Sequence, residues 1–274
     1  MYQGIHVLEK FDQWDDWFGK NNKIYVGDDK NYIQNMGVVL KSEATEAVPK
    51  AKDHGIVKGE YIVHLKQYHP CKVKPANTEQ TIALELLRDD TIPLVTMLGA
   101  AGGGKTYLAC AHALHALQKE QVSRVIIAKS LVPVGKDVGY LKGDLLEKVK
   151  PWLGSFYDNF LKLGKSNFEI DNMITSGKIE ISPITFIQGR SISDAVLIID
   201  EIQNLDLLII KQIITRAGSN CKVLLLGDPS QRFERGSIDL PLLVDKCKSS
   251  SLTGHIYFRK SIRSPLAQWA VENL

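Results

Sequence analysis

Short apolar runs rich in β-branched residues alternate with stretches of helical periodicity from about residue 76 onward. Helical patterns lie between several of these runs, for example over 105–118 and 205–217. Such alternation is typical of an α/β fold, in which helices flank a mostly parallel sheet. Ligands bind sheets of this kind at the carboxyl ends of the strands. The predicted strands cover 92–98, 122–128, 178–182, 195–199, 221–226 and 254–258.

Residues 1–70 differ in texture from the rest of the chain. Strand-like runs occur at 36–40 and 60–65, whereas the polar stretch 41–54 predicts a loop or a weak helix. We interpret the segment either as a small accessory region or as an extension that packs onto the core. The α/β domain is expected to occupy residues 71–274.

A glycine-rich loop follows the first predicted strand and opens the predicted helix 105–118. It fits the pattern G-x-x-x-x-G-K-[ST] in the strand–loop–helix context that the pattern requires. Small residues let the backbone curl so that its N–H groups point at phosphate oxygens, and the helix N-terminus adds its positive dipole end. We expect Lys105 to reach the β- and γ-phosphates of ATP, and Thr106 to offer its hydroxyl to Mg²⁺. The loop consists of Gly99, Ala100, Ala101, Gly102, Gly103, Gly104, Lys105 and Thr106.

Two adjacent acids end the predicted strand 195–199. Asp200 and Glu201 follow Ala-Val-Leu-Ile-Ile, so that a buried strand delivers both carboxylates to its tip. In P-loop enzymes the first acid of such a pair holds magnesium, which assigns Asp200 to the metal. Glu201 is then expected to orient and deprotonate the attacking water. Taken alone, the pair also fits a solvated turn after a strand.

Two glutamines are further candidates. Gln231 follows the strand 221–226 in Gly-Asp-Pro-Ser-Gln, where it could hydrogen-bond the γ-phosphate or the attacking water. An ordinary Gly-Asp-Pro turn is the alternative for that segment. Gln80 lies at the start of the first core helix, where Asn77 predicts an N-cap and Gln80 would complete a capping box.

Composition narrows the class of protein. The 274 residues are 44% hydrophobic, enough for one large domain or two smaller ones. The net charge of +3 is too small to indicate nucleic-acid binding by itself. No apolar run approaches the ~20 residues that span a bilayer, and the N-terminus lacks the pattern of a secretory signal, so we expect a cytoplasmic protein without membrane contact. The four cysteines form no CxxC pair, which predicts neither a zinc site nor a disulfide framework.

The phosphate loop, Asp-Glu-x-Gln-Asn at 200–204 and Gly-Asp-x-x-Gln at 227–231 together resemble superfamily-1 helicases. The chain resembles the PhoH-like ATPase family more closely, over about residues 70–274. This resemblance implies a RecA-like P-loop core, hydrolysis of ATP with magnesium, and RNA or single-stranded DNA as the partner, with unwinding reported in the family. The blocks that carry it are 74–106, 131–153, 183–204 and 254–270.

The resemblance also implies roles for particular residues. Gln80 would contact adenine, as the Asn-x-x-Gln element does in related helicases. Lys129 and Ser130 fall where helicases grip the nucleic-acid backbone, and Arg190 is a further candidate, for which a solvated surface charge is the alternative. Arg263 matches an arginine of the PhoH pattern. Because the sequence contains one α/β core, we expect Arg263 to act as an arginine finger in a neighbouring subunit of a homo-oligomer, for which a ring is one arrangement.

The sequence departs from the family at two points. Gly103 stands where the family usually carries threonine, which adds flexibility to the loop. The longer PhoH-like proteins can carry a PIN nuclease domain, but residues 1–70 lack well-spaced acids at strand ends, so no nuclease activity is expected. Two alternative functions stay open, namely an ATP-binding switch or assembly module and a small-molecule kinase, although the acid pair suits water activation better than a hydroxyl acceptor.

Overall fold

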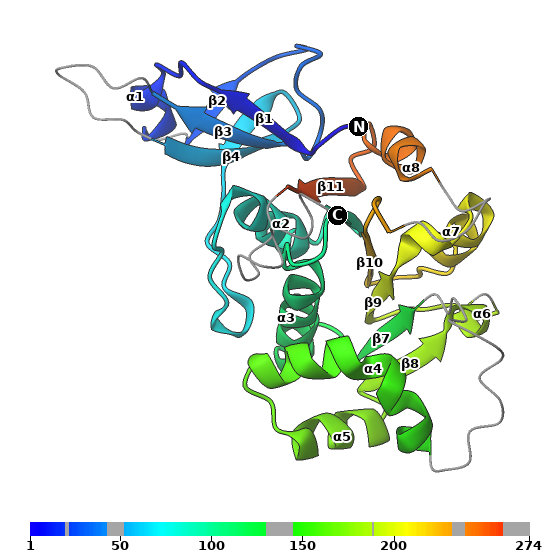
Figure 1. Ribbon diagram of the computed structural model, residues 1–274. Helices are drawn as coiled ribbons and strands as arrows, with labels where there is room; N and C mark the ends of the chain where they lie inside the picture. Colours follow the sequence, from blue (N-terminus) through cyan, green and yellow to red (C-terminus); the bar gives the residue numbers. More distant parts are fainter. Residues whose placement is uncertain (20–21, 43–51, 130–144, 188, 232–238, 260–274) are drawn as a thin grey trace.

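Two β-sheets organise the chain (Figure 1). A six-stranded sheet with helices on both faces forms the larger part, and a five-stranded sheet formed within residues 5–64 lies beside it. Within the described ranges, no helix combines the length and the apolar character that a bilayer crossing needs. The computed structural model describes residues 1–19, 22–42, 52–129, 145–187, 189–231 and 239–259.

All strands of the larger sheet run parallel, in the order β11-β6-β10-β9-β7-β8. The predicted α/β fold with a mostly parallel sheet flanked by helices is thereby confirmed. One strand, β10, separates the strand that leads into the phosphate loop from the strand that ends in the acid pair. The strands lie close to their predicted bounds: β6 (Leu94–Gly99), β7 (Arg124–Lys129), β8 (Ile179–Pro183), β9 (Ala195–Asp200), β10 (Cys221–Gly227) and β11 (Thr253–Phe258).

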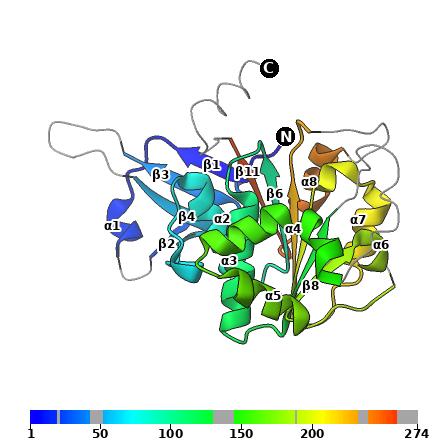
Figure 2. The same cartoon turned by 60° about the horizontal axis from the view of Figure 1, so that its bottom comes forward.

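Helices cover both faces of this sheet because its strands are apolar on both sides. On β6, Val95 and Met97 face one core, whereas Leu94 and Leu98 face the other. The two helices predicted from periodicity are α3 and α7, and Figure 2 shows α4 crossing in front of α3, against which it packs. The first core is covered by α2 (Thr78–Arg88), α3 (Lys105–Gln118), α4 (Leu145–Lys162) and α5 (Asn167–Thr175), and the second by α6 (Ile184–Ile187), α7 (Leu207–Ile214) and α8 (Leu240–Cys247).

The smaller sheet has the strand order β1-β3-β4-β5-β2, in which β1 and β3 are parallel and the other pairs antiparallel. Fully buried Trp17 lies in its core together with Leu40 and Ile62. The strands predicted within this region are confirmed as β3 and β5. Its elements are β1 (Ile5–Leu8), α1 (Trp14–Trp17), β2 (Lys23–Tyr25), β3 (Gly37–Lys41), β4 (Lys52–Lys58) and β5 (Tyr61–His64).

The expected loop or weak helix over 41–54 is wrong at its end, where β4 begins at Lys52. Asp53 favours turns and caps rather than strands. It nevertheless pairs in register with Leu40 of β3, which is buried, and tertiary pairing of this kind outweighs intrinsic strand propensity. Residues 43–51 of the same stretch lie outside the described ranges.

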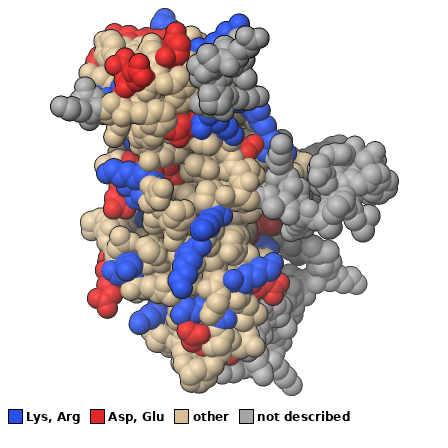
Figure 3. Space-filling model, turned by 90° about the vertical axis from the view of Figure 1, so that its left-hand side faces the viewer, with Lys and Arg blue, Asp and Glu red and all other residues tan. Residues whose placement is uncertain are grey.

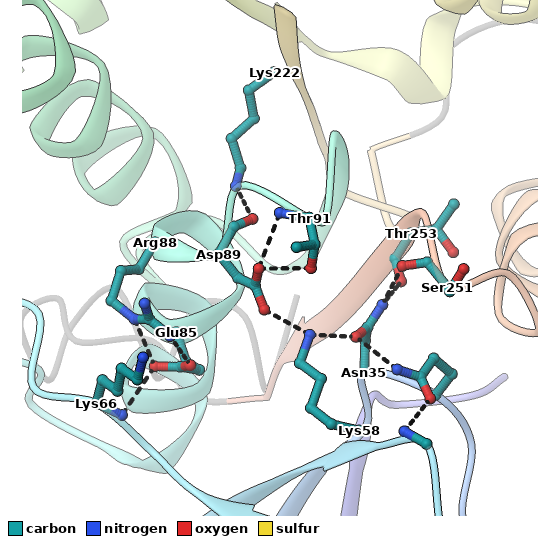
Figure 4. A network of polar contacts seen from close by, with 12 residues as sticks. Asn35, Lys58, Lys66, Glu85, Arg88, Asp89, Thr91, Lys222, Ser251 and Thr253 are labelled. Carbon is teal, nitrogen blue, oxygen red and sulfur yellow. Dashed lines mark hydrogen bonds and ion pairs between the residues drawn. The ribbon is translucent and has the colours of Figure 1, made fainter. Parts of the chain in front are cut away.

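A polar network fixes the smaller sheet to the larger domain (Figure 4). Asn35 donates from Nδ2 to the carbonyl oxygens of Ser251 and Thr253, each at 2.9 Å, next to the start of β11. Lys58 on β4 donates to Asn35 Oδ1 at 2.7 Å and forms an ion pair with Asp89 Oδ2 at 2.6 Å.

Asp89 lies where α2 ends and takes part in this network from the side of the larger domain. Lys222 at the start of β10 donates to the Asp89 carbonyl oxygen at 2.7 Å. Burial alone raises the pKa of the Asp89 carboxyl, but hydrogen bonds from Lys58 and Thr91 outweigh it and lower that pKa to about 2. The two sheets are therefore joined through an ionised carboxylate.

Candidate nucleotide-binding site

A cavity of about 560 Å³ lies at the carboxyl edge of the six-stranded sheet. This is where ligands bind parallel sheets, and the volume is in the usual range for small-molecule sites. The segment before α2 and the helix α4 also contribute to its walls. The cavity brings together most of the residues predicted from the sequence: Gln80, Ala101, Gly102, Gly104, Lys105, Thr106, Lys129, Asp200, Glu201 and Gln231.

The phosphate loop connects β6 directly to α3, whose first residue is Lys105. Gly104 has a left-handed φ of 94°, and a Cβ there would lie 2.6 Å from Gln80 Nε2. Gly103 packs against β11, since a Cβ at this position would lie 2.7 Å from Phe258 Cβ. A Cβ at this position would require Phe258 to shift, so close packing favours the glycine that stands where the family usually carries threonine.

Lys105 is 9% exposed and points back into its own loop. Its ammonium group donates to the carbonyl oxygens of Gly99 and Ala100, the latter at 2.9 Å. These acceptors hold the cation beside the backbone groups that would cradle a phosphate. The side chain is therefore already inside the site at the place where phosphate oxygens can replace the carbonyls.

Asp200 and Glu201 lie at the tip of β9, as predicted, in different environments. Asp200 is buried, and burial, followed by the charge of Glu201, raises the pKa of its carboxyl to about 6. Glu201 adopts a left-handed φ of 58°, which is costly for a non-glycine residue and is typical of functional sites. Its N–H donates to Asp200 Oδ1 at 3.0 Å, so a hydrogen bond holds the turn between the two residues.

Two residues that the sequence analysis did not select complete this edge. Gln203 is 1% exposed; its Nε2 donates to Glu201 Oε2 at 2.6 Å, and its Oε1 accepts from the Asp228 N–H at 3.0 Å. Asp228, at the tip of β10, uses Oδ1 to accept from Ser230, while its buried Oδ2 has no hydrogen-bond partner within the described part of the chain. The Gly-Asp and Glu-x-Gln spacings were the available signals.

Mg²⁺ fits the residues present. A buried carboxylate with an unpartnered oxygen and a neighbouring carboxyl whose pKa is raised are both relieved by a cation. Asp200 and Thr106 line the same cavity, and Asp228 lies beside them. Carboxylate and hydroxyl oxygens are the ligands that magnesium prefers.

Gln80 lies against the phosphate loop. Asn77 is the predicted N-cap, accepting from the Gln80 N–H at 2.9 Å. The Gln80 amide does not return to Asn77 as a capping box would require: Oε1 accepts from the Ala76 N–H at 2.8 Å, and Nε2 donates to the Gly103 carbonyl at 3.2 Å. Both ends of the amide thus have partners in the chain, and contact with adenine stays a prediction.

Of the remaining candidates that the structure describes, two line the cavity and one does not. Gln231 is exposed on the cavity wall. Lys129 lies at the tip of β7, and its Nζ is 3.9 Å from Glu201 Oε1. Arg190 forms an ion pair with Glu180 of β8 and does not line the cavity. Ser130 and Arg263 lie outside the described residues, so their roles stay predictions.

The solved structures to which the chain is similar are distant. A crystal structure of the DnaC helicase loader has a TM-score of 0.32 and 13% identity, over 68% of this chain and 94% of that one. Unliganded Pif1 from Bacteroides sp. has a TM-score of 0.32 and 15% identity, over 70% of this chain and 43% of that one. Similarity at this level says nothing about activity.

Sequence relatives are much closer. Protein PhoH2 of Bacillus subtilis is 38% identical over 290 residues, which cover all of this chain and 64% of that protein. Protein PhoH2 of Mycolicibacterium smegmatis is 34% identical over 203 residues, covering 72% of this chain and 46% of that protein. The chain therefore spans less than two thirds of the length of these relatives. The family model described as PhoH-like protein matches residues 72–274, and the chain belongs to this family.

Proposed function

We propose that the chain is a magnesium-dependent ATPase that couples hydrolysis to binding of, and translocation on or unwinding of, single-stranded RNA or DNA. One observation carries the proposal: the phosphate loop, the acid pair of β9 and the Gly-Asp-x-x-Gln tip of β10 converge on one cavity. A phosphate site alone fits any nucleotide-binding protein. A carboxylate held beside it, where it can accept the proton of an attacking water, favours hydrolysis over binding alone.

Lysine, glutamate and glutamine side chains at this site have distinct tasks in this proposal. Lys105 leaves the Gly99 and Ala100 carbonyls to bind the β- and γ-phosphates. Glu201 accepts the proton of the attacking water, and Gln203 fixes the direction of its carboxylate. Gln231 lies exposed on the wall, where it can contact the γ-phosphate or that water.

Magnesium would be held by Thr106 and Asp200, with Asp228 beside them, and would supply positive charge for the phosphate oxygens. The buried Asp200 carboxyl must be ionised for this task. Its pKa of about 6 leaves it mostly ionised at neutral pH, and the nearby ammonium groups of Lys129 and Lys105 lower that pKa.

Nucleic acid as the partner rests on family membership and on Lys129. This lysine pairs in register with Asp200 on the adjacent strand and is close to Glu201. A backbone phosphate that draws Lys129 away from Glu201 would alter the environment of the base. This contact offers a route by which nucleic acid stimulates hydrolysis. Arg190 is the second candidate for the same partner, although its pairing with Glu180 would first have to open.

ATPase assays with and without single-stranded RNA or DNA test the proposal. Lys105→Ala should abolish turnover, and Glu201→Gln should keep ATP binding and stop hydrolysis. Lys119→Ala, at the exposed residue that directly follows the helix α3, is the matched control. Binding of nucleic acid should weaken as salt rises because phosphate contacts release counterions.

Three results would change the assignment. Binding of ATP without turnover would indicate a switch or assembly module. Phosphate transfer to a small-molecule acceptor would indicate a kinase. Turnover that no single-stranded RNA or DNA stimulates at low salt would remove the nucleic-acid half of the proposal.

A further inference from the structure

Part of the cavity wall has no task in the phosphate chemistry. The phosphate loop and the tips of β9 and β10 supply the groups that would contact the triphosphate and the attacking water. Further lining residues come from the segment before α2, with Lys74, and from the last two turns of α4. Among the residues of α4 whose side chains are described, those that line the cavity are Ser155, Asn159 and Lys162.

The helix α4 presents these residues as one rigid face. Their spacing of four and three residues places them on the same side of a helix. Phe156 and Phe160, on a different side, are buried in the core that α4 shares with α3. Because these two rings fix the rotation of α4, its polar face is held toward the cavity before any ligand binds.

Several polar side chains in this part of the cavity wall can form further hydrogen bonds or ion pairs. Lys74 and Lys162 are exposed, and neither ammonium forms an ion pair with a residue whose side chain the structure describes. Asn159 donates from Nδ2 to the Ser155 carbonyl at 2.8 Å. Its second amide hydrogen and its Oδ1 have no hydrogen-bond partner among the described residues and can therefore bind a ligand. Gln80, by contrast, has partners at both ends of its amide.

We propose that α4 forms the nucleoside-recognition wall of the ATP site, with Asn159 as a base-reading residue and with Lys162 and Lys74 contacting the base or ribose. This inference rests on the proposed function. A side-chain amide carries a donor and an acceptor side by side, the arrangement that pairs with the adenine edge. An ammonium over the face of a base gains the same attraction that cations have for aromatic rings. Tyr107, at the start of α3, lines the same cavity.

Comparison of ATP with inorganic tripolyphosphate tests the assignment, because tripolyphosphate contains the phosphate chain without a nucleoside. Dissociation constants of both, with magnesium, are measured by calorimetry for Asn159→Ala and Lys162→Met. Each variant should bind ATP about 5- to 10-fold more weakly, the loss of one or two hydrogen bonds, and should bind tripolyphosphate like the parent chain. Asn159→Ala should also reduce the difference between the dissociation constants for ATP and for GTP.

Controls separate this inference from the proposed function. Asp158→Ala alters an exposed neighbour on α4 that does not line the cavity, and it should leave both ligands unaffected. Lys105→Ala should weaken ATP and tripolyphosphate alike, and its failure to do so would remove the phosphate site itself. If Lys162→Met weakened the binding of ATP and of tripolyphosphate equally, this lysine would be a phosphate ligand. Unchanged ATP binding in both α4 variants would overturn the nucleoside wall while leaving the ATPase proposal in place.

Discussion

Gln203 is expected to control the activity of Glu201 without touching the nucleotide. Its buried amide joins Glu201 Oε2, at 2.6 Å, to the Asp228 N–H, at 3.0 Å, and so ties the tip of β9 to the tip of β10. Gln203→Leu keeps the apolar bulk of the side chain and removes both hydrogen bonds. The change therefore isolates the positioning of the base from its chemistry.

The size of the effect follows from those two contacts. A buried Asp228 N–H without an acceptor costs about 1–3 kcal/mol, and a hydrogen bond to a charged carboxylate contributes about 1.5–3 kcal/mol. The free energy of unfolding should fall by about 2–4 kcal/mol, since part of the loss is recovered by relaxation. A general base contributes about 10²–10⁴ in rate, and a misdirected carboxylate keeps part of that, so kcat should fall about 10- to 100-fold.

Steady-state ATPase kinetics, ATP binding by calorimetry and thermal unfolding are measured on the same preparations. The KM for ATP should change little, because Gln203 has no position in the cavity wall. Gln121→Leu is the matched control, since Gln121 is exposed and its side chain makes no hydrogen bond to the part of the protein that is described. A Gln203→Leu protein that turns over ATP at the parent rate would refute the positioning role, whatever its stability.

Three further predictions use other parts of the structure. Asn77→Ala should lower the free energy of unfolding by about 1 kcal/mol through loss of the α2 cap, measured by urea titration, with Asn167→Ala as an exposed control. Because the pKa of Asp89 is lowered to about 2, its contribution to stability is complete above about pH 4 and is lost as pH falls toward 2. Asp89→Asn should therefore lower the free energy of unfolding at neutral pH, and that free energy should fall less steeply across the acid range than in the parent chain. If Arg263 acts on a neighbouring subunit, mixtures of Lys105→Ala and Arg263→Ala chains should recover ATPase activity that neither shows alone, and co-assembled mixtures without recovery would contradict this role.

The elements of the larger sheet were predictable because its strands are buried on both faces. A strand such as Val-Leu-Leu-Leu in β10 has no polar side to interrupt the apolar run, and it ends where the chain returns to polar residues. Position along the chain then placed the phosphate loop and the acid pair at strand tips. Parallel pairing brought these tips to one edge, as the fold class requires.

The parts that were not predictable depend on contacts between distant segments. Nothing local in Asp-Glu-Ile-Gln-Asn distinguishes a buried Gln203 from a solvated one, because its burial depends on β10 lying beside β9. The sequence of α4 reads as an amphipathic helix whether its polar face meets solvent or a ligand. The strand β4 forms because β3 provides a pairing partner. The composition of β4 by itself does not indicate a strand.

The first turn of α2 connects the smaller sheet to the phosphate loop. From β4, Lys52 Nζ donates to Thr78 Oγ1 at 2.9 Å, and the His54 ring lies 3.2 Å from the same hydroxyl. Two residues further along that turn, Gln80 bonds the Gly103 carbonyl of the loop. The smaller sheet therefore acts on the same helical turn that supports the nucleotide site, and the match to the Bacillus relative extends over this region as well. A substitution in β4 can reach the phosphate loop through one turn of helix, so the smaller sheet belongs to the ATP site's supporting structure although none of its residues lines the cavity.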